Sequence, residues 1–176
     1  MKGKKADNIQ KSFSEVDVIL GSSAPFLVSL SDSLDGELRV VIAEASVDVQ
    51  EFVPEQSDSE EVASEAVQNV LKSTHSIIPR ASVQYEIVFR DYIMYQTRNE
   101  SYCSFDPEEI RRGKYLITFE ESKLLSNVSN ITDAQILSDE TYYPGRWVHY
   151  GIYTQNHIID VISHNAPSIT VLNRKK

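Results

Sequence analysis

The residues best able to do chemistry lie close together near the end of the chain, between positions 146 and 164. This stretch holds three of the four histidines, the only tryptophan and an aspartate: His149, His157, His164, Trp147 and Asp160. Imidazole and carboxylate groups together can bind zinc or iron, or can move protons in a hydrolytic reaction. Their spacing completes neither a metal motif nor a catalytic triad, so these residues alone do not assign a function.

One hypothesis is a small metal-dependent or hydrolytic enzyme centred on His149, His157 and Asp160. If positions 146–153 and 157–163 form a hairpin, His149 and His157 share one sequence parity, whereas Asp160 has the other. Alternate residues of a strand point to opposite faces of a sheet. We therefore expect His149 and Asp160 on opposite faces, and histidines that serve the structure, satisfied by backbone or tyrosine hydroxyls. No cofactor is predicted.

Two other groups of residues could support catalysis. Cys103 lies near Asp106 and could form a thiolate pair with a histidine, but no sharp glycine turn marks a nucleophile there. Asp91 and Glu100 could form an acid pair with Arg90 or Arg98 between them, as glycoside hydrolysis requires. A buried ion pair needs the same residues and no substrate. The structural interpretation is favoured for both groups.

A second hypothesis is a binding surface built from aromatic side chains. Tyrosine and tryptophan are enriched at protein interfaces, although they are also ordinary residues of β-sheets. If the rings gather on one exposed sheet face, that face is a partner site. The candidate binding residues are Tyr92, Tyr95, Tyr102, Trp147, Tyr150 and Tyr153.

Composition narrows the classes of partner. The chain has 176 residues and a net charge of −9, and nucleic-acid binding needs clustered Lys and Arg, so nucleic acid is not expected. A basic protein is the partner that an acidic surface would attract. One cysteine and no apolar export segment predict a cytoplasmic protein, and no apolar run is long enough to span a membrane. The oligomeric state is left open.

The elements that must position these residues are mostly strands. Alternation predicts one long half-buried strand from 83 to 96, broken by a bulge near Arg90 and Asp91. Asp35 and Gly36 predict a hairpin between 26–30 and 38–43. Further strands are expected at 16–20, 115–119, 146–153, 157–163 and 168–172. The order of these elements favours an α+β fold with a mainly antiparallel sheet and one or two packed helices.

Helices and flanking segments complete the expected domain. Apolar residues recur at helical spacing over 60–73, and one or two helical turns are expected between 121 and 128. Positions 51–61 carry many acidic residues and predict a solvated loop. We expect a disordered tail at 1–14 and a single α+β domain over 15–173.

The second half of the chain also resembles a family of uncharacterised bacterial proteins. The motifs are Tyr85 to Phe89, Tyr92 to Gln96, Asn99 to Tyr102, His149 to Ile152 and Asn156 to Val161, and the resemblance covers 85–172. It implies the type of an immunity protein and supplies no residue roles. The leading hypothesis is therefore a non-enzymatic binding protein, with immunity against a basic toxin as one version, and the enzyme described above is the alternative.

Overall fold

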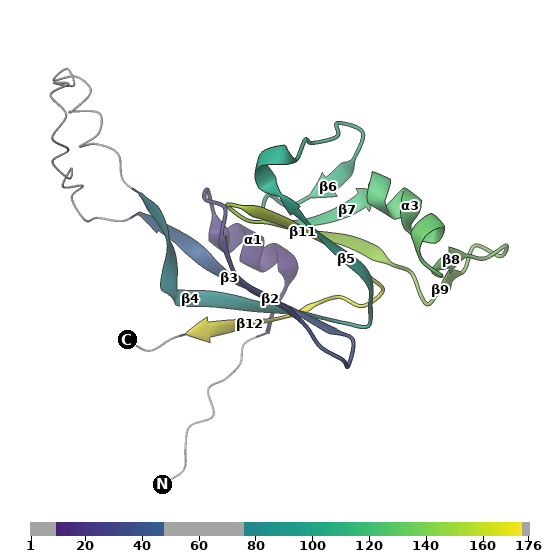
Figure 1. Ribbon diagram of the computed structural model, residues 1–176, viewed down its shortest axis with the longest axis horizontal. Helices are drawn as coiled ribbons and strands as arrows, with labels where there is room; N and C mark the ends of the chain where they lie inside the picture. The colour runs from purple at the N-terminus through teal and green to yellow at the C-terminus, as the bar shows by residue number, and fades with distance from the viewer. Residues whose placement is uncertain (1–9, 48–75, 174–176) are drawn as a thin grey trace, which may run out of the picture.

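The computed structural model describes residues 10–47 and 76–173, and these form two antiparallel five-stranded sheets with two α-helices (Figure 1). Sheet A has the order β1 (Gln10–Lys11), β12 (Ser168–Asn173), β4 (Ile77–Arg90), β3 (Glu37–Val47) and β2 (Phe26–Asp32). Sheet B has the order β5 (Tyr92–Asn99), β11 (His157–Ser163), β10 (Val148–Tyr153), β7 (Leu116–Glu121) and β6 (Ile110–Arg112). The predicted α+β fold with mainly antiparallel sheet is confirmed.

The remaining elements are short. Helix α1 (Phe13–Leu20) lies between the two sheets, and α3 (Lys123–Ile131) lies beside sheet B on the side away from sheet A (Figure 1). A 3-10 turn, η1 (Glu100–Tyr102), follows β5, and strands β8 (Gln135–Ile136) and β9 (Tyr142–Tyr143) pair with each other. The expected helix at 60–73 and the acidic loop at 51–61 lie outside the described residues.

The predicted long strand runs from sheet A into sheet B. Strand β4 ends at Arg90 and β5 begins at Tyr92, and Asp91 between them has a φ of 55°. That positive φ turns the chain, and it explains how Asp91 leaves the alternation of apolar residues. Ile87 and Phe89 are fully buried, as the alternation predicts.

The two sheets and α1 enclose one main core. It is built from alternate residues of the strands that face one another, among them Val40 of β3, Ile87 of β4 and Ile159 of β11. The chain also passes from sheet B to sheet A between β11 and β12. Strand β11 pairs with β5 in sheet B, and β12 pairs with β4 in sheet A. The sheets are therefore joined at one corner by two paired strands, and the apolar residues between them form a continuous cluster.

The segment 16–20 is helical, so its prediction as a strand was wrong. Ser12 accepts a hydrogen bond from the Glu15 amide and the Glu15 side chain accepts one from the Ser12 amide, which is a complete capping box. Val16 and Leu20, four residues apart, are buried on one side. This start signal and spacing outweigh the β propensity of the run. Positions 10–14, expected in a disordered tail, belong to β1 and to the start of α1.

Helix α1 is fastened to sheet B through one carboxylate. Asp17 accepts hydrogen bonds from three successive amides, those of Lys114, Tyr115 and Leu116, at 2.9, 2.7 and 2.8 Å. These amides form the turn that leads into β7. The contact joins positions that are far apart in the sequence, so it fixes where α1 lies against sheet B.

Replacing this carboxylate should loosen the helix. Asp17→Ala leaves three amides without their acceptor, so we expect the free energy of unfolding to fall by about 2–3 kcal/mol. Urea denaturation followed by Trp147 fluorescence measures the change. Asp35→Ala, in the exposed β2–β3 turn, is the control and should change stability little. Equal stability of the two variants would contradict the role given to Asp17.

No helix in the described part of the chain is both long enough and apolar enough to cross a membrane.

Candidate functional site

The candidate site lies on the outer face of sheet B, defined as the face turned away from sheet A. Alternate residues of β11 divide this face into three zones. Ile158 lines a pocket at one end, Asp160 lines a second pocket at the centre, and Ile162 packs under α3 at the other end. The intervening residues Ile159 and Val161 belong to the main core. Strand β11 therefore presents one charged residue in the middle of an otherwise apolar row.

His149 and Asp160 lie on the same face, so the expectation that they lie on opposite faces was wrong. His149 Nε2 is 3.1 Å from Asp160 Oδ1. In the β10–β11 hairpin His149 pairs with Ile162 and Gly151 pairs with Asp160, so odd positions of one strand face even positions of the other. Sequence parity holds within one strand, but the register across a turn decides which residues of two strands share a face.

Asp160 is the centre of a buried polar network. Its side chain accepts hydrogen bonds from Arg98 Nε at 2.8 Å, from Gln96 Nε2 at 3.0 Å and from His149. A second nitrogen of Arg98 also donates to Asp160, at 3.2 Å, which makes the guanidinium bidentate. Asp160 has no exposed surface. Burying a carboxylate is costly unless its oxygens are satisfied, and here three side chains satisfy them.

The network continues through His149 to the start of α3. Ser122, the N-cap residue of α3, accepts the Leu125 amide through Oγ, and the same hydroxyl lies 2.8 Å from His149 Nδ1. Because Oγ already accepts that amide, its own hydrogen is available to His149, and His149 Nε2 then donates to Asp160. The hydrogen bonds therefore run from Ser122 to His149 and from His149 to the acceptor Asp160. Both ring nitrogens of His149 are engaged.

Aromatic rings and a glycine fix this arrangement in place. The Phe119 ring stacks on the His149 ring, with centroids 4.1 Å apart and planes 8° apart. A Cβ at Gly151 would lie 3.0 Å from an atom of the Tyr153 ring and 3.1 Å from an atom of the Phe119 ring. Only a glycine at position 151 leaves these two rings in place. His149 is thereby held from one side by stacking and at both nitrogens by hydrogen bonds.

A pocket of about 390 Å³ opens above the network. Asp160, His149 and Gln96 line it together with Asn127 of α3 and Tyr153 of β10. Burial, followed by the charge of Asp160, raises the pKa of Tyr153, so its hydroxyl stays protonated at neutral pH. The pocket therefore offers hydrogen-bond donors and acceptors side by side.

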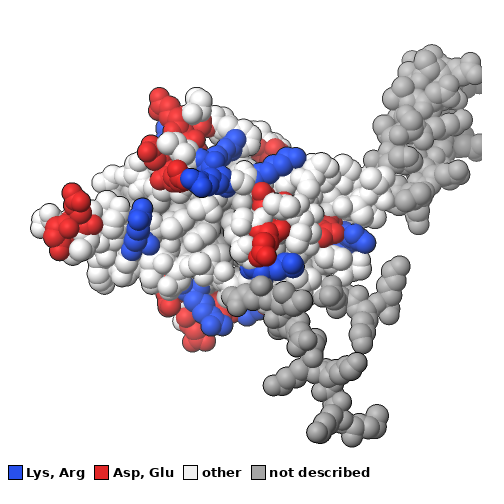
Figure 2. Space-filling model, turned by 180° about the vertical axis from the view of Figure 1, so that it is seen from behind, with Lys and Arg blue, Asp and Glu red and all other residues white. Residues whose placement is uncertain are grey.

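Both cations of this pocket are already paired with carboxylates, and a third carboxylate, Glu109, lies beside them. Arg98 is paired with Asp160, and Lys123 at the rim forms an ion pair with Asp106. Glu109 accepts the backbone amide of Lys123. On the molecular face shown in Figure 2, acidic and basic groups likewise alternate in small groups between wide uncharged areas. The net charge of −9 does not collect into an acidic patch on that face.

Asp160 ties the stability of the fold to pH. Burial alone would raise its pKa, but hydrogen bonds from His149, Gln96 and Arg98 outweigh burial and hold the pKa of Asp160 below its ordinary value of 3.8. A carboxyl with a lowered pKa in the folded state stabilises the protein fully above the ordinary value. That contribution is lost as the pH falls through the lowered pKa.

Asp160→Asn should therefore differ from the wild type most at neutral pH. We expect the difference in unfolding free energy between the two proteins to stay constant near neutral pH and to shrink as the pH falls below 3.8 and through the lowered pKa of Asp160, because the carboxylate is then protonated. Urea denaturation at a series of pH values measures this. A difference that stays constant over the whole range would show that Asp160 does not ionise as described.

The six aromatic candidates do not form one exposed surface. Trp147 and Tyr150 are both buried, the first in the cluster beneath α3 and the second in the main core. Tyr92 and Tyr95 pack against the main core, and their rings are 5.5 Å apart. Of the six, only Tyr102 is widely exposed. Tyr153 lines both pockets of the outer face and is the one candidate that lies at the site.

The structure separates His157 from the other two residues of the proposed metal group. Along β11, Ile158 and Asp160 point to the outer face. His157 is an odd-numbered residue like Ile159 and Val161, so it points to the opposite face, toward sheet A. Among the residues that the structure describes, no group of three His, Cys, Asp or Glu side chains could hold a metal ion. His149 and Asp160 do meet, but with Ser122 and Arg98 as their partners.

Neither arginine proposed to lie between Asp91 and Glu100 binds those two acids. Arg98 binds Asp160, and Arg90 binds Glu37, so neither joins Asp91 to Glu100. Cys103 donates a hydrogen bond from Sγ to the Asn99 carbonyl and lines the pocket next to Ile158.

Sequence reasoning missed Ser122, Gln96 and Phe119, and it gave Arg98 a different partner. Ser122 could have been found, because a serine just before the apolar spacing of Leu124, Leu125 and Val128 is a typical N-cap. Gln96 and Arg98 depend on the pairing of β5 with β11, which no local pattern predicts.

Comparison with known proteins adds no relative: no protein-family model, curated protein or solved structure matches the chain. The geometry of the outer face is therefore the basis for any assignment of function.

Proposed function

We propose that the protein is a non-enzymatic binding protein whose outer face of sheet B holds a small, uncharged, hydroxyl-bearing molecule. The observation that carries this proposal is the closed network of Ser122, His149, Asp160 and Arg98. A general base must present a free nitrogen or oxygen to the proton that it removes. Both nitrogens of His149 are bound to protein partners, its ring face is covered and it is 3% exposed.

The chemistry of the pocket supports an uncharged ligand. Its two cations are already paired with carboxylates, so an anion gains no unmatched partner there, and the remaining carboxylate, Glu109, accepts the backbone amide of Lys123. Gln96, Asn127 and Tyr153 provide donors and acceptors of the kind that hydroxyl groups satisfy in both roles. Small-molecule sites commonly combine a few such polar groups with aromatic walls, and here Phe119 and Tyr153 supply the walls.

The test is a nuclear magnetic resonance titration of the full chain with a panel of monosaccharides and nucleosides. Ligand binding should shift amide signals around Gln96, Asn127 and Tyr153. Asn127→Ala removes one pocket group from an exposed position of α3 and should weaken binding. Ser129→Ala, at another exposed position of α3 and outside the pocket, should bind as the wild type does. Shifts that appear elsewhere, or in no case, would overturn the proposal.

A second candidate is a serine hydrolase, because Ser122, His149 and Asp160 are linked by hydrogen bonds in the order of a catalytic triad. Two observations weigh against it. The Ser122 hydroxyl caps α3, and Ser122 is 5% exposed. Hydrolysis of p-nitrophenyl acetate separates the candidates. If the protein is a hydrolase, the wild type hydrolyses the ester and Ser122→Ala does not. If it is a binding protein, the wild type is no more active than Ser122→Ala.

A further inference from the structure

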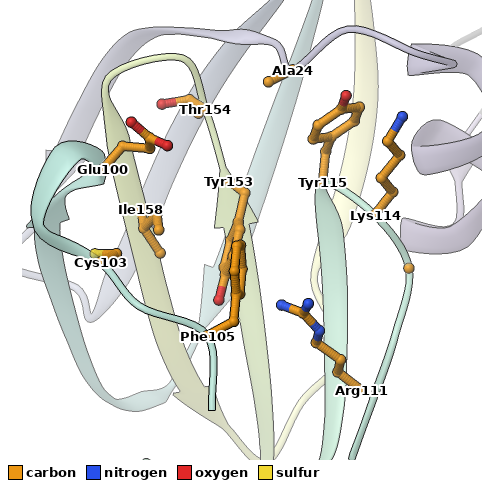
Figure 3. A pocket seen from close by; sticks show the side chains of 11 residues that line it. Ala24, Glu100, Cys103, Phe105, Arg111, Lys114, Tyr115, Tyr153, Thr154 and Ile158 are labelled. Atoms are coloured by element: carbon orange, nitrogen blue, oxygen red, sulfur yellow. The ribbon is translucent and has the colours of Figure 1, made fainter. Parts of the chain in front are cut away.

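A second pocket, of about 380 Å³, lies on the outer face of sheet B next to the Asp160 pocket (Figure 3). Tyr153 lines both pockets, so it separates them. Ile158 of β11 and Tyr115 lie on either side of Tyr153, with Cys103 beyond Ile158 (Figure 3). Unlike the Asp160 pocket, this one is bounded mainly by apolar and aromatic groups.

One wall of this pocket is the aromatic ring of Phe105, which contacts other side chains but stays largely exposed. Phe105 stacks on Tyr153, with ring centroids 5.8 Å apart and planes 21° apart. Phe105 is nevertheless 61% exposed. Because a stacked pair offers a flat apolar surface, a planar molecule lying against these rings would remove that surface from water.

The same wall carries a cation that has no acidic partner among the described residues. The Arg111 guanidinium carbon lies 4.2 Å from the centroid of the Phe105 ring, and Figure 3 shows the guanidinium directed into the pocket. Among the described residues Arg111 forms no ion pair, whereas the adjacent Arg112 binds Glu120 at 2.5 Å. The other charged groups of the pocket, Glu100 and Lys114, have opposite signs, so the Arg111 guanidinium is the group that an anionic ligand could pair with.

The turn that carries this cationic wall is fixed in position. Gly113, between Arg111 and Lys114, has a φ of 101°, and a Cβ there would lie 2.2 Å from the Leu116 carbonyl oxygen, so only glycine fits. Asp17 binds the three amides that follow, and the Tyr115 hydroxyl donates to the Ser22 carbonyl at 2.6 Å. The wall is therefore preorganised, which lowers the entropy cost of binding.

We propose that this pocket binds a small aromatic carboxylate. The carboxylate would accept two parallel hydrogen bonds from the Arg111 guanidinium, and the aromatic ring would lie against Phe105 and Tyr153. The pocket volume is near the lower end of the range for small-molecule sites, which suits a ligand of one or two rings. This site does not depend on the uncharged ligand proposed for the Asp160 pocket, because the two pockets use different polar groups.

Isothermal titration calorimetry of the full chain tests the proposal with benzoate, phenylacetate and indole-3-acetate. Phenylacetamide keeps the ring and removes the charge, and acetate keeps the charge and removes the ring. We expect an aromatic carboxylate to bind at least about tenfold more tightly than either control, because losing a charge-assisted hydrogen bond costs that much or more. Equal binding of phenylacetamide, or no measurable heat at millimolar carboxylate, would overturn the proposal.

Two variants and one thiol locate the site. Arg111→Gln removes the charge and should weaken carboxylate binding about tenfold or more, whereas Arg112→Gln, its exposed neighbour, should bind as the wild type does. Cys103 lines the pocket and is the only cysteine, so bound carboxylate should slow its reaction with a thiol reagent. Equal losses in the two variants, or a Cys103 rate unchanged at saturating ligand, would show binding outside this pocket.

Discussion

Asp160→Ala should destabilise the protein by about 3–5 kcal/mol, the range found when one partner of a buried ion pair is removed. The variant deletes the acceptor shared by Arg98, Gln96 and His149, and it leaves an arginine beside a buried strand without a counter-charge. Trp147 is the only tryptophan and is buried on the same face, so its fluorescence reports the loss. Urea denaturation at neutral pH gives the free energy.

A matched control separates this buried pair from an ordinary surface pair. Glu120→Ala removes the partner of Arg112 on sheet B, where both side chains are exposed and water screens the charges. Its stability should stay close to that of the wild type. A comparable loss in both variants would mean that Asp160 is stabilised no more than an exposed carboxylate.

The second large effect is expected where β4 approaches the corner between the sheets. Phe89 is fully buried, and its ring centroid lies 5.5 Å from that of Tyr150 on the opposing sheet. Phe89→Ala removes the ring and leaves a cavity between the sheets, so we expect a loss of about 3–5 kcal/mol. Thermal denaturation measures it. Leu34→Ala, in the fully exposed β2–β3 turn, is the control and should melt as the wild type does.

A small loss in Phe89→Ala would have a definite meaning. It would show that the two sheets close together around the missing ring, since the cost of a core truncation depends on how well the site collapses.

Local patterns were enough to predict most of the strands and one helix. The alternation from Val83 to Tyr95 placed the long strand and its break at Asp91, and Asp35 with Gly36 placed the first hairpin. The turn between 153 and 157 likewise placed β10 and β11. These features depend on residues near one another in the chain, where spacing and turn chemistry act directly.

The candidate site could not be predicted in the same way. Whether His149 meets Asp160 depends on the register of one turn, and a shift of one residue moves every side chain of a strand to the other face. Arg98 reaches Asp160 only because β5 pairs with β11, some 60 positions apart, a contact set by the whole fold. Helix α1 was missed because Val16 to Leu20 have high β propensity and the decisive capping residues precede them.

The position of β12 in sheet A has a consequence for how the protein is made. This strand is the last described element of the chain, yet it lies between β1, the first, and β4. While the chain is still emerging from a ribosome, β4 has an unpaired edge and β1 has no neighbour at all. An open strand edge is a template for pairing with other chains. Sheet A can close only after residue 173 has emerged, so synthesis passes through a stage at which nascent chains are most exposed to aggregation.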